Sequence, residues 1–439
     1  MQNLISSLSR RTFLKLGAMT SAAGVAGTAS ASAAAAKTNP KGSGKISFWH
    51  HYTSDGERAG FAKVVDAFKV KSPAITLDIT TVTNDDWMTK YIAATAAKSG
   101  PDTLMVTAAR FKDMRKIGGL KDITAQVKNW PAKDGVSTTI GAFTERGKSY
   151  GVPWFTFIDW MYYRKDLFDA AGITKPPATL EEFRQTAIAL TNPSKNQYGF
   201  AMRGGSGGGG FIPKMIHAWN GPFINPRTLL RQVKFETVRD AVSFWVNLSV
   251  KDKAVVPTVT SDGFAQIMAN FQTGKAAMVM HHTGSFVQVA GYFKYGTQVE
   301  TAAMPAGAGA STGFTSPLAH GIFASTKNPD AGFEWISYMG EAPAQVTFLK
   351  ETGYFPTAAS ASEDAYVGAT PQYKVALKAI GVYDTEYTFP GYTNWVSNTC
   401  LPEFQKALTG SQTAEKAARN IYDELGRVCT AASKALLSK

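Results

Sequence analysis

The sequence predicts an α/β protein of two domains. Strand-like and helix-like stretches alternate after residue 45, the chain beyond its leader has about 400 residues, and 44% of all residues are hydrophobic. Alternation of this kind indicates largely parallel strands with helices on the faces of the sheet. The length suits two cores, because single hydrophobic cores stop growing at roughly 250–300 residues.

The first 36 residues have the features of an export signal. Arg10 and Arg11 precede Phe-Leu-Lys and a mild apolar stretch over residues 16–28. Paired arginines in this setting resemble a twin-arginine signal. Cleavage motifs of the Ala-x-Ala type end at Ala31, Ala33 and Ala36. No cysteine stands nearby to carry a lipid, so we expect a soluble periplasmic protein with no lipid anchor.

The chain is basic, and its positive charges are dispersed. Its formal net charge is +13, and the leader contributes only Arg10, Arg11 and Lys15 to it. A basic balance can serve nucleic acids, anionic surfaces or anionic ligands. Because no long basic run occurs, we interpret the charge as a solvated surface, with an acidic or phosphorylated ligand as the alternative.

The two cysteines, Cys400 and Cys429, both lie in the C-terminal segment. Disulfides form in the oxidising compartments that an export signal implies. We predict that these residues pair, which would stabilise the fold by roughly 3–4 kcal/mol on the loop-entropy model. The alternative is two unrelated buried thiols.

The first elements after the leader form a strand, helix, strand unit. Residues 45–51 alternate between two faces, Phe61 and Phe68 belong to a helical face, and residues 75–81 alternate again. This order predicts two parallel strands joined by a helix.

The same alternation continues through a helix over 87–98, a strand over 103–107 and a helix over 110–118. Ligands of such sheets bind at the carboxyl ends of the strands. We therefore expect His50 and the turn at 108–110 to lie near a binding cleft.

A second α/β unit follows. Thr179 and Glu182 have the spacing of a capping box at the start of a helix. Residues 203–210 are rich in glycine, but no Gly-Lys-Ser/Thr follows, as phosphate binding would require. We interpret this run as a flexible loop over a ligand cleft.

The last elements are a helical face over 264–271, a strand over 276–280 and a helical face over 414–425. The strand stops at His281 and His282, so a second strand end carries polar side chains.

The order and spacing of short motifs resemble the family 1 extracellular solute-binding proteins of ABC transporters, which include maltose, oligosaccharide and glycerol-3-phosphate binders. The motifs are Phe48-Trp49-His50, Ser99-Gly100-Pro101-Asp102, Tyr150-Gly151-Val152-Pro153, Tyr162 to Phe168, Ala170-Ala171-Gly172, Pro176 to Phe183, Phe271 to Met278, Gly284-Ser285-Phe286, Lys327 to Ala331 and Gly353 to Thr357. The chain departs from the family at Arg164, where Asn is usual, and at Phe286, where Trp is frequent.

The resemblance implies a two-lobe, type II-like periplasmic binding protein fold, in which each lobe is a mixed sheet flanked by helices and the ligand cleft lies between the lobes. Residues 1–36 would be the twin-arginine signal peptide and residues 37–44 a linker. The N-terminal lobe would comprise 45–156 plus 318–356, and the C-terminal lobe 157–317 plus 357–439. Crossings between the lobes are expected near 155–160, 314–321 and 354–357.

Sugar binding calls for aromatic plates that stack on C–H faces and for charged or amide groups that hydrogen bond to hydroxyls. Both kinds of side chain occur at the expected strand ends and crossings. The aromatic candidates are Trp87, Trp154, Trp160, Trp219, Phe286, Tyr354 and Trp395. The polar candidates are His50, Arg110, Asp159, His281, His282, Ser285 and His320. Each aromatic competes with an ordinary role in core packing.

Two other functional classes fit less well. Adjacent histidines on a strand point to opposite faces and no short Cys/His ligand pattern accompanies them, so we expect neither a metal site nor a cofactor. A secreted glycan-active enzyme would need two carboxylates such as Asp159 and Glu236 held about 5–10 Å apart. Neither a Gly-x-Ser-x-Gly elbow nor a His-Glu-x-x-His helix occurs.

The sequence thus predicts a non-enzymatic, monomeric, substrate-binding component of an ABC importer, with the permease subunits and the twin-arginine export machinery as partners. A neutral sugar is the first choice of ligand. A polyol, a sugar acid or sn-glycerol 3-phosphate is the alternative, because Arg110, Arg203 and the basic balance suit an anion.

Overall fold

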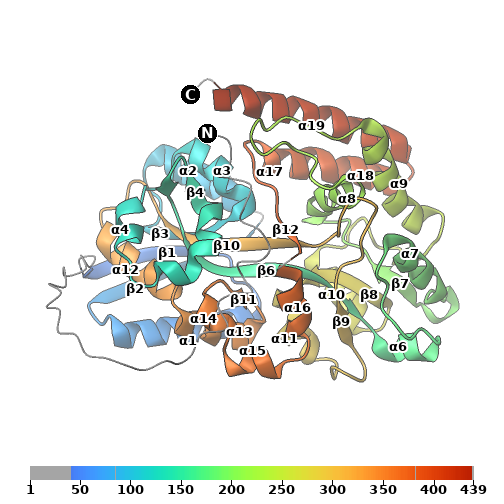
Figure 1. Cartoon of the computed structure of the whole chain (residues 1–439), viewed down its shortest axis with the longest axis horizontal. Helices are drawn as coiled ribbons and strands as arrows, with labels where there is room; N and C mark the ends of the chain where they lie inside the picture. The colour runs from blue at the N-terminus through green and yellow to red at the C-terminus, as the bar shows by residue number, and fades with distance from the viewer. Residues whose placement is uncertain (1–40, 85, 381, 438–439) are drawn as a thin grey trace, which may run out of the picture. The chain divides into compact units, whose positions relative to one another are not determined.

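The computed structural model describes residues 41–84, 86–380 and 382–437. The predicted signal peptide over 1–36 and the first half of the predicted linker, residues 37–40, lie outside these residues. The fold is a mixed α/β fold of two lobes, as predicted, and its sheets are flanked by helices (Figure 1).

The strands form one continuous main sheet in the order β2-β1-β3-β10-β6-β8-β7. The first three pair in parallel and β7 pairs in parallel with β8, whereas β10 and β6 are antiparallel to their neighbours. The strands on this path are β1 (Gly44–His50), β2 (Ile75–Thr81), β3 (Thr103–Thr107), β6 (Val152–Tyr163), β7 (Tyr198–Ala201), β8 (Ala276–His282) and β10 (Phe314–Ile322).

Short strands join the sheet at its middle and one hairpin stands apart. The first group is β9 (Glu300–Ala302), β11 (Phe355–Pro356) and β12 (Asp384–Thr385), and the hairpin is β4 (Thr144–Glu145) with β5 (Lys148–Ser149).

Strand β6 connects the two lobes. Its first half pairs with β10 and β11, and from Asp159 onward it pairs with β8 and β9. Figure 1 shows β6 and β10 running through the middle of the molecule, between the helices of one lobe and those of the other.

Helices cover the sheet in each lobe. Those of the N-terminal lobe are α1 (Asp55–Lys71), α2 (Trp87–Ala97), α3 (Ala108–Ile117), α4 (Thr124–Lys128), α5 (Ser137–Ile140), α12 (Pro329–Met339) and α13 (Ala342–Thr352). Helix α14 (Ala359–Ser362) lies beyond the expected lobe boundary at residue 357, but its Ala361 packs in the same buried cluster as Phe48 and Trp335. Those of the C-terminal lobe are α6 (Lys165–Ala170), α7 (Leu180–Ala189), α8 (Phe211–Asn220), α9 (Phe235–Val250), α10 (Phe264–Gln272), α11 (Phe286–Ala290), α15 (Ala365–Ala369), α16 (Tyr373–Ile380), α17 (Tyr392–Trp395), α18 (Leu401–Leu408) and α19 (Ala414–Leu437).

Local sequence signals explain several of these boundaries. The predicted strands over 75–81 and 103–107 are observed with those bounds. Thr179 and Glu182 make both hydrogen bonds of the predicted capping box at the start of α7. A second box, made by Ser54 and Glu57, starts α1.

Three clusters of buried hydrophobic side chains fill the fold. One lies under β1, β2 and β3 and includes Phe48 and Trp335. A second lies beneath the helices of the C-terminal lobe and includes Trp395, and a third surrounds Trp160 at the far half of β6. Each lobe therefore has its own packed interior.

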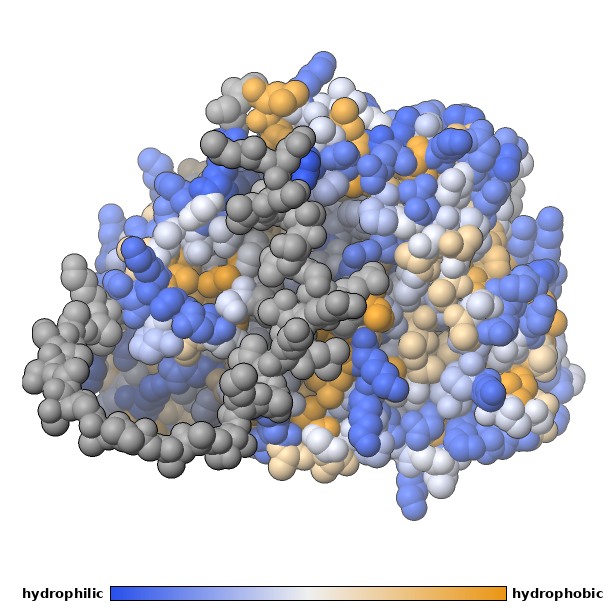
Figure 2. Space-filling view, viewed as in Figure 1, coloured by the Kyte–Doolittle hydropathy of each residue, from blue (hydrophilic) through white to orange (hydrophobic). Residues whose placement is uncertain are grey.

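The face of the protein seen in Figure 2 is mostly hydrophilic where side chains are coloured, with hydrophobic residues in small scattered groups. Large exposed hydrophobic residues such as Val70 and Tyr292 lie far apart in the sequence. Within the described ranges, none of the helices is long and apolar enough to cross a membrane.

The predicted disulfide is wrong, because Cys400 and Cys429 are both free and buried in the structure. Cys400 ends a π-helical turn, η6 (Val396–Cys400), and Cys429 lies within α19. Both pack in the second hydrophobic cluster. Burial raises the pKa of the Cys429 thiol to about 11 and that of Cys400 well above its usual value, which disfavours the thiolate that disulfide chemistry needs.

Several histidines are buried in neutral form. Burial lowers the pKa of His50 to about 4 and holds that of His320 well below its usual range. His50 accepts a hydrogen bond from the Tyr52 N–H at Nδ1, whereas neither ring nitrogen of His320 has a hydrogen-bond partner among the residues that the structure describes. His320 lies between Phe48 and Trp154, an apolar site for an imidazole.

We predict that acid destabilises the fold through these residues. The unfolded chain protonates each histidine near pH 6.5 and the folded chain only well below that value. As pH falls below 6.5 the unfolded state binds more protons, so the free energy of unfolding decreases by up to about 1.4 kcal/mol per pH unit for each histidine. Urea unfolding between pH 7.5 and 5 measures this slope.

His320→Leu should reduce the change in the free energy of unfolding with pH by about the contribution of one histidine. The buried control Phe323→Leu should leave that change the same as in the unaltered protein. An unchanged slope in His320→Leu would show that His320 is not held neutral.

Candidate ligand cleft

A cavity of about 320 Å³ lies between the lobes at the middle of the sheet. Its walls are formed by the carboxyl ends of β3 and β8, the central parts of β6 and β10, the glycine-rich loop before α8, and the segment around α17. Its lining residues are Asn84, Thr107, Ala108, Ala109, Arg110, Phe157, Asp159, Arg203, Gly207, Gly210, Phe211, Lys214, His281, His282, Ser316, Pro317, Leu318, Glu386, Tyr392, Thr393, Val396 and Ser397. We call this space the cleft cavity.

A buried ion pair crosses the floor of the cleft cavity. The Lys214 ammonium lies 2.5 Å from Asp159 Oδ2, and their side chains are 16% and 8% exposed. The same oxygen accepts the Phe314 N–H at 3.0 Å. Lys214 stands one turn into α8, directly after the glycine-rich run, so the loop and the helix position it together. The pair leaves further donors on the ammonium for a ligand.

The two histidines at the end of β8 present their rings to the cavity. His282 Nδ1 accepts the Gly284 N–H at 3.1 Å, which leaves the proton of the neutral ring on Nε2. Ser285 Oγ lies 2.8 Å from His281 Nδ1. Burial holds the pKa of both imidazoles well below its usual range, and Lys214 and Arg203 add to the shift. Both rings are therefore neutral at pH 7.

Glu386 contributes a carboxylate from the chain segment between β12 and α17. Its Oε2 accepts a hydrogen bond from Ser316 Oγ at 2.8 Å. Burial raises the pKa of this carboxyl, and the positive charge of Lys214 opposes that shift. The cavity thus combines three cationic groups, on Arg110, Arg203 and Lys214, with two acidic ones.

The aromatic side chains of the cavity are already engaged by protein groups. The Phe157 ring is stacked on His282 with centroids 3.7 Å apart. The Lys214 ammonium lies 5.5 Å from the centre of the Phe211 ring. Tyr392 is 3% exposed and packs against Phe389. The cavity therefore offers polar groups more readily than open aromatic faces.

The glycine-rich loop fits closely around the cavity. Gly207 has a φ of +76°, and a Cβ there would overlap the Arg203 guanidinium. A Cβ on Gly209 would lie 2.3 Å from the Val396 carbonyl oxygen, while nothing lies within 4 Å of the Cβ position of Gly210. The run that we interpreted as a cleft loop does line the cavity, and the loop needs glycine at particular positions to do so.

Four of the sequence-predicted site residues meet in the cleft cavity, namely Arg110, Asp159, His281 and His282. Ser285 is fully buried behind them and acts on the cavity through its contact with His281. The Tyr354 hydroxyl donates to Glu57, and its ring packs against Phe155 and Phe157. Tyr354 thus supports the cavity wall from outside the lining residues.

The structure buries the remaining candidates among other side chains, apart from the half-buried Trp219. Trp154 donates to the Tyr52 hydroxyl at 2.9 Å and Trp395 donates to the Ile421 carbonyl at 3.1 Å. Trp219 packs beside Phe244, outside the residues that line the cavity. The other buried candidates are His50, Trp87, Trp160, Phe286 and His320. Neighbouring side chains cover the apolar surface of these residues. The spacing of residues in the sequence could not reveal this burial.

Sequence reasoning also missed several lining residues, above all Lys214 and Glu386. Lys214 follows the glycine run by one helical turn, and that proximity was the available signal. Glu386 had none, because it lies far in the sequence from Asp159 and Lys214 and reaches the cavity through the pairing of β12 with β10.

A model of the bacterial extracellular solute-binding protein family matches residues 53–346, more than half of the chain. The chain belongs to this family.

Known solute-binding proteins are similar along most of its length. The mannitol-binding protein of Pseudomonas aeruginosa is 26% identical over 328 residues, which span 68% of this chain and 74% of the relative. Among solved structures, the GacH receptor of Streptomyces glaucescens, solved unliganded and with acarbose, superposes with a TM-score of 0.80 at 21% identity and covers 88% of this chain and 99% of the receptor.

A solute-binding protein of Agrobacterium vitis with bound D-mannitol gives a TM-score of 0.74 at 23% identity and covers 87% of this chain and 97% of that protein. These two structures establish the shared fold. The family and these neighbours are binding proteins, and the family is extracellular.

We predict that Gly209→Ala lowers the melting temperature and that Gly210→Ala leaves it within about 1 °C of the unaltered protein. The first substitution forces the loop away from the Val396 carbonyl, whereas the second enters open space. Differential scanning calorimetry of both variants measures the difference. Equal melting temperatures would mean that the loop does not pack as described.

Proposed function

We propose that this solute-binding protein is the periplasmic substrate-binding component of an ABC importer and captures a small polyhydroxylated solute, a sugar or a polyol, in the cleft cavity. The observation that carries the proposal is the buried Asp159–Lys214 pair in a cavity between two lobes. A hydroxyl group both donates and accepts hydrogen bonds, so a carboxylate beside an ammonium suits neighbouring hydroxyls of one solute.

The size and chemistry of the cavity favour a short solute. Its volume of about 320 Å³ is near the lower limit of small-molecule pockets, which is roughly 300 Å³. The Phe157 and Phe211 rings are engaged by His282 and Lys214, so stacking on a chain of sugar rings is disfavoured. Mannitol binding by two similar proteins supports the same choice.

An anionic solute, a sugar acid or sn-glycerol 3-phosphate, is the second candidate. Three cationic side chains face two carboxyl groups in the cavity, and burial raises the pKa of one of these, Glu386. A bound carboxylate or phosphate would find donors on Arg110, Arg203 and Lys214.

The mechanism follows from the two-lobe fold. We propose that lobes of residues 45–156 plus 318–356 and 157–317 plus 357–439 rotate about the crossing strands. Solute would bind one lobe first, and contacts from the other would favour the closed form. The permease would then recognise the closed monomer, and the solute would be released unchanged.

Solute capture by the cleft predicts a thermal shift. The melting temperature of the protein without residues 1–36 is measured with each of five solutes: mannitol, erythritol, maltose, gluconate and sn-glycerol 3-phosphate. A solute that binds the cleft should raise the melting temperature by about 3 °C at a concentration of one hundred times its Kd. We expect the largest shift with a polyol.

Asp159→Asn should weaken binding of the solute that gives this shift by about 2 kcal/mol, or roughly thirtyfold, measured by calorimetry. Asp252→Asn is the matched control, because Asp252 forms an ion pair with Arg184 in the same lobe and lies outside the cavity. An Asp159→Asn protein that is folded and binds as tightly as the control would exclude Asp159 from the site. Conversion of the solute would contradict the binding-protein proposal itself.

We further propose export through the twin-arginine pathway, supported by Arg10-Arg11 in the leader. Replacing both arginines with lysine should leave full-length protein in the cytoplasm, as measured by cell fractionation. The exposed pair Arg58→Lys and Arg239→Lys is the control and should not change export. Normal export of the leader variant would mean that another pathway is used.

A further inference from the structure

A second cavity, about 1030 Å³ in volume, lies on the other side of the contact between the lobes. Asp113 of α3 accepts the Gly391 N–H at 2.8 Å. Ala108 to Arg110 of α3 line the cleft cavity, and Lys112, Arg115 and Lys116 of the same helix line the second one. Phe389 and Pro390 line the second cavity, Tyr392 and Thr393 line the cleft cavity, and Glu386 lines both. The hydrogen bond therefore lies between two neighbouring cavities that adjoin at Glu386.

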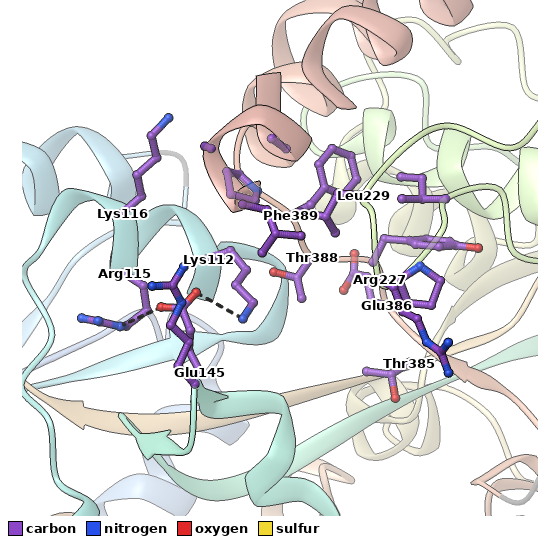
Figure 3. A pocket seen from close by; sticks show the side chains of 18 of the residues that line it. Lys112, Arg115, Lys116, Glu145, Arg227, Leu229, Thr385, Glu386, Thr388 and Phe389 are labelled. Atoms are coloured by element: carbon purple, nitrogen blue, oxygen red, sulfur yellow. Dashed lines mark hydrogen bonds and ion pairs between the residues drawn. The ribbon is translucent and has the colours of Figure 1, made fainter. Parts of the chain in front are cut away.

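One wall of the second cavity is apolar. It comes from the loop before α9, from the segment before α17 and from the last turns of α19. Its side chains are Pro222, Ile224, Pro226, Leu229, Phe389, Pro390, Ala432, Ala435 and Leu436. Figure 3 shows Leu229 and Phe389 on one side of the space, opposite α3. A volume near the upper limit of about 1,000 Å³ for small-molecule pockets leaves room for an extended apolar group.

The other wall and the rim are cationic. Six lysine and arginine side chains line the cavity against three carboxylates. The cationic residues are Lys112, Arg115, Lys116, Arg146, Lys148 and Arg227. Figure 3 shows Lys112 and Arg227 on opposite sides of the opening.

The three carboxylates already have partners inside the protein. Glu145 lies 3.4 Å from Lys112 and 3.5 Å from Arg115, Asp384 lies 3.1 Å from His217, and Glu386 accepts from a serine hydroxyl. Lys116, Arg146 and Arg227 form no ion pair with any residue that the structure describes. The net field of the cavity therefore favours a negative charge.

We propose that the second cavity is a binding site for an amphipathic organic anion, a molecule with an extended apolar body and a carboxylate or phosphate at one end. The apolar body lies against the wall of Leu229, Phe389 and α19, and the anionic end lies among Lys112, Arg227 and the other rim cations. Most residues that line this site do not line the cleft cavity, so its test requires no cleft ligand.

Decanoate is the probe for this site, with decyltrimethylammonium as a probe of the same chain length and opposite charge. Isothermal calorimetry on the protein without residues 1–36 should show one decanoate per protein and no binding of the cation. Arg227→Glu should weaken decanoate binding about tenfold, and the exposed control Lys251→Glu should not change it. Saturation of the cleft with its own solute should leave the decanoate stoichiometry at one.

Filling the cavity provides the second variant. Ala435→Trp places an indole against the open space and should abolish decanoate binding, whereas Ala431→Trp, on an exposed position of the same helix, should preserve it. Lack of decanoate binding to the unaltered protein, or equal binding by both tryptophan variants, would overturn the proposal. A dimer that Ala435→Trp dissociates would also overturn it, because a second copy would then fill the cavity.

Discussion

The whole arrangement depends on a change of pairing partner along strand β6. Ile158 pairs with Thr315 of β10, and the next residue, Asp159, pairs with His282 of β8. The strand is buried along almost all of its length, so its register is fixed by the interiors of both lobes. A charged group placed where the partner changes is held between the lobes, and the cleft cavity forms around it.

Burying Asp159 there is costly unless the charge is compensated, because a carboxylate loses its hydration. Lys214 and the Phe314 N–H provide that compensation. Removing one partner of such a pair usually costs more than the pair itself contributes, since an uncompensated charge remains. The pair therefore adds little net stability, and its effect is to hold a carboxylate and an ammonium at fixed positions on the wall of the cleft cavity.

The sequence predicted the elements well because their signals are local. The alternation over 75–81 and the Thr179–Glu182 capping box depend on neighbours a few residues away, and both are observed. Only some of the predicted site residues line the cleft cavity. Trp154 and Trp395 were predicted as aromatic ligand contacts but are buried in the core, because spacing cannot distinguish a core position from a cleft position. Glu386 reaches the cavity only through long-range strand pairing.

The two cavities share parts of their walls. Helix α3 and the segment that leads into α17 line both, with the Asp113–Gly391 hydrogen bond between them. The lobe rotation that we propose would therefore displace the walls of both cavities at once. An occupant of either cavity contacts elements that also line the other, so the same side chains position both sets of walls.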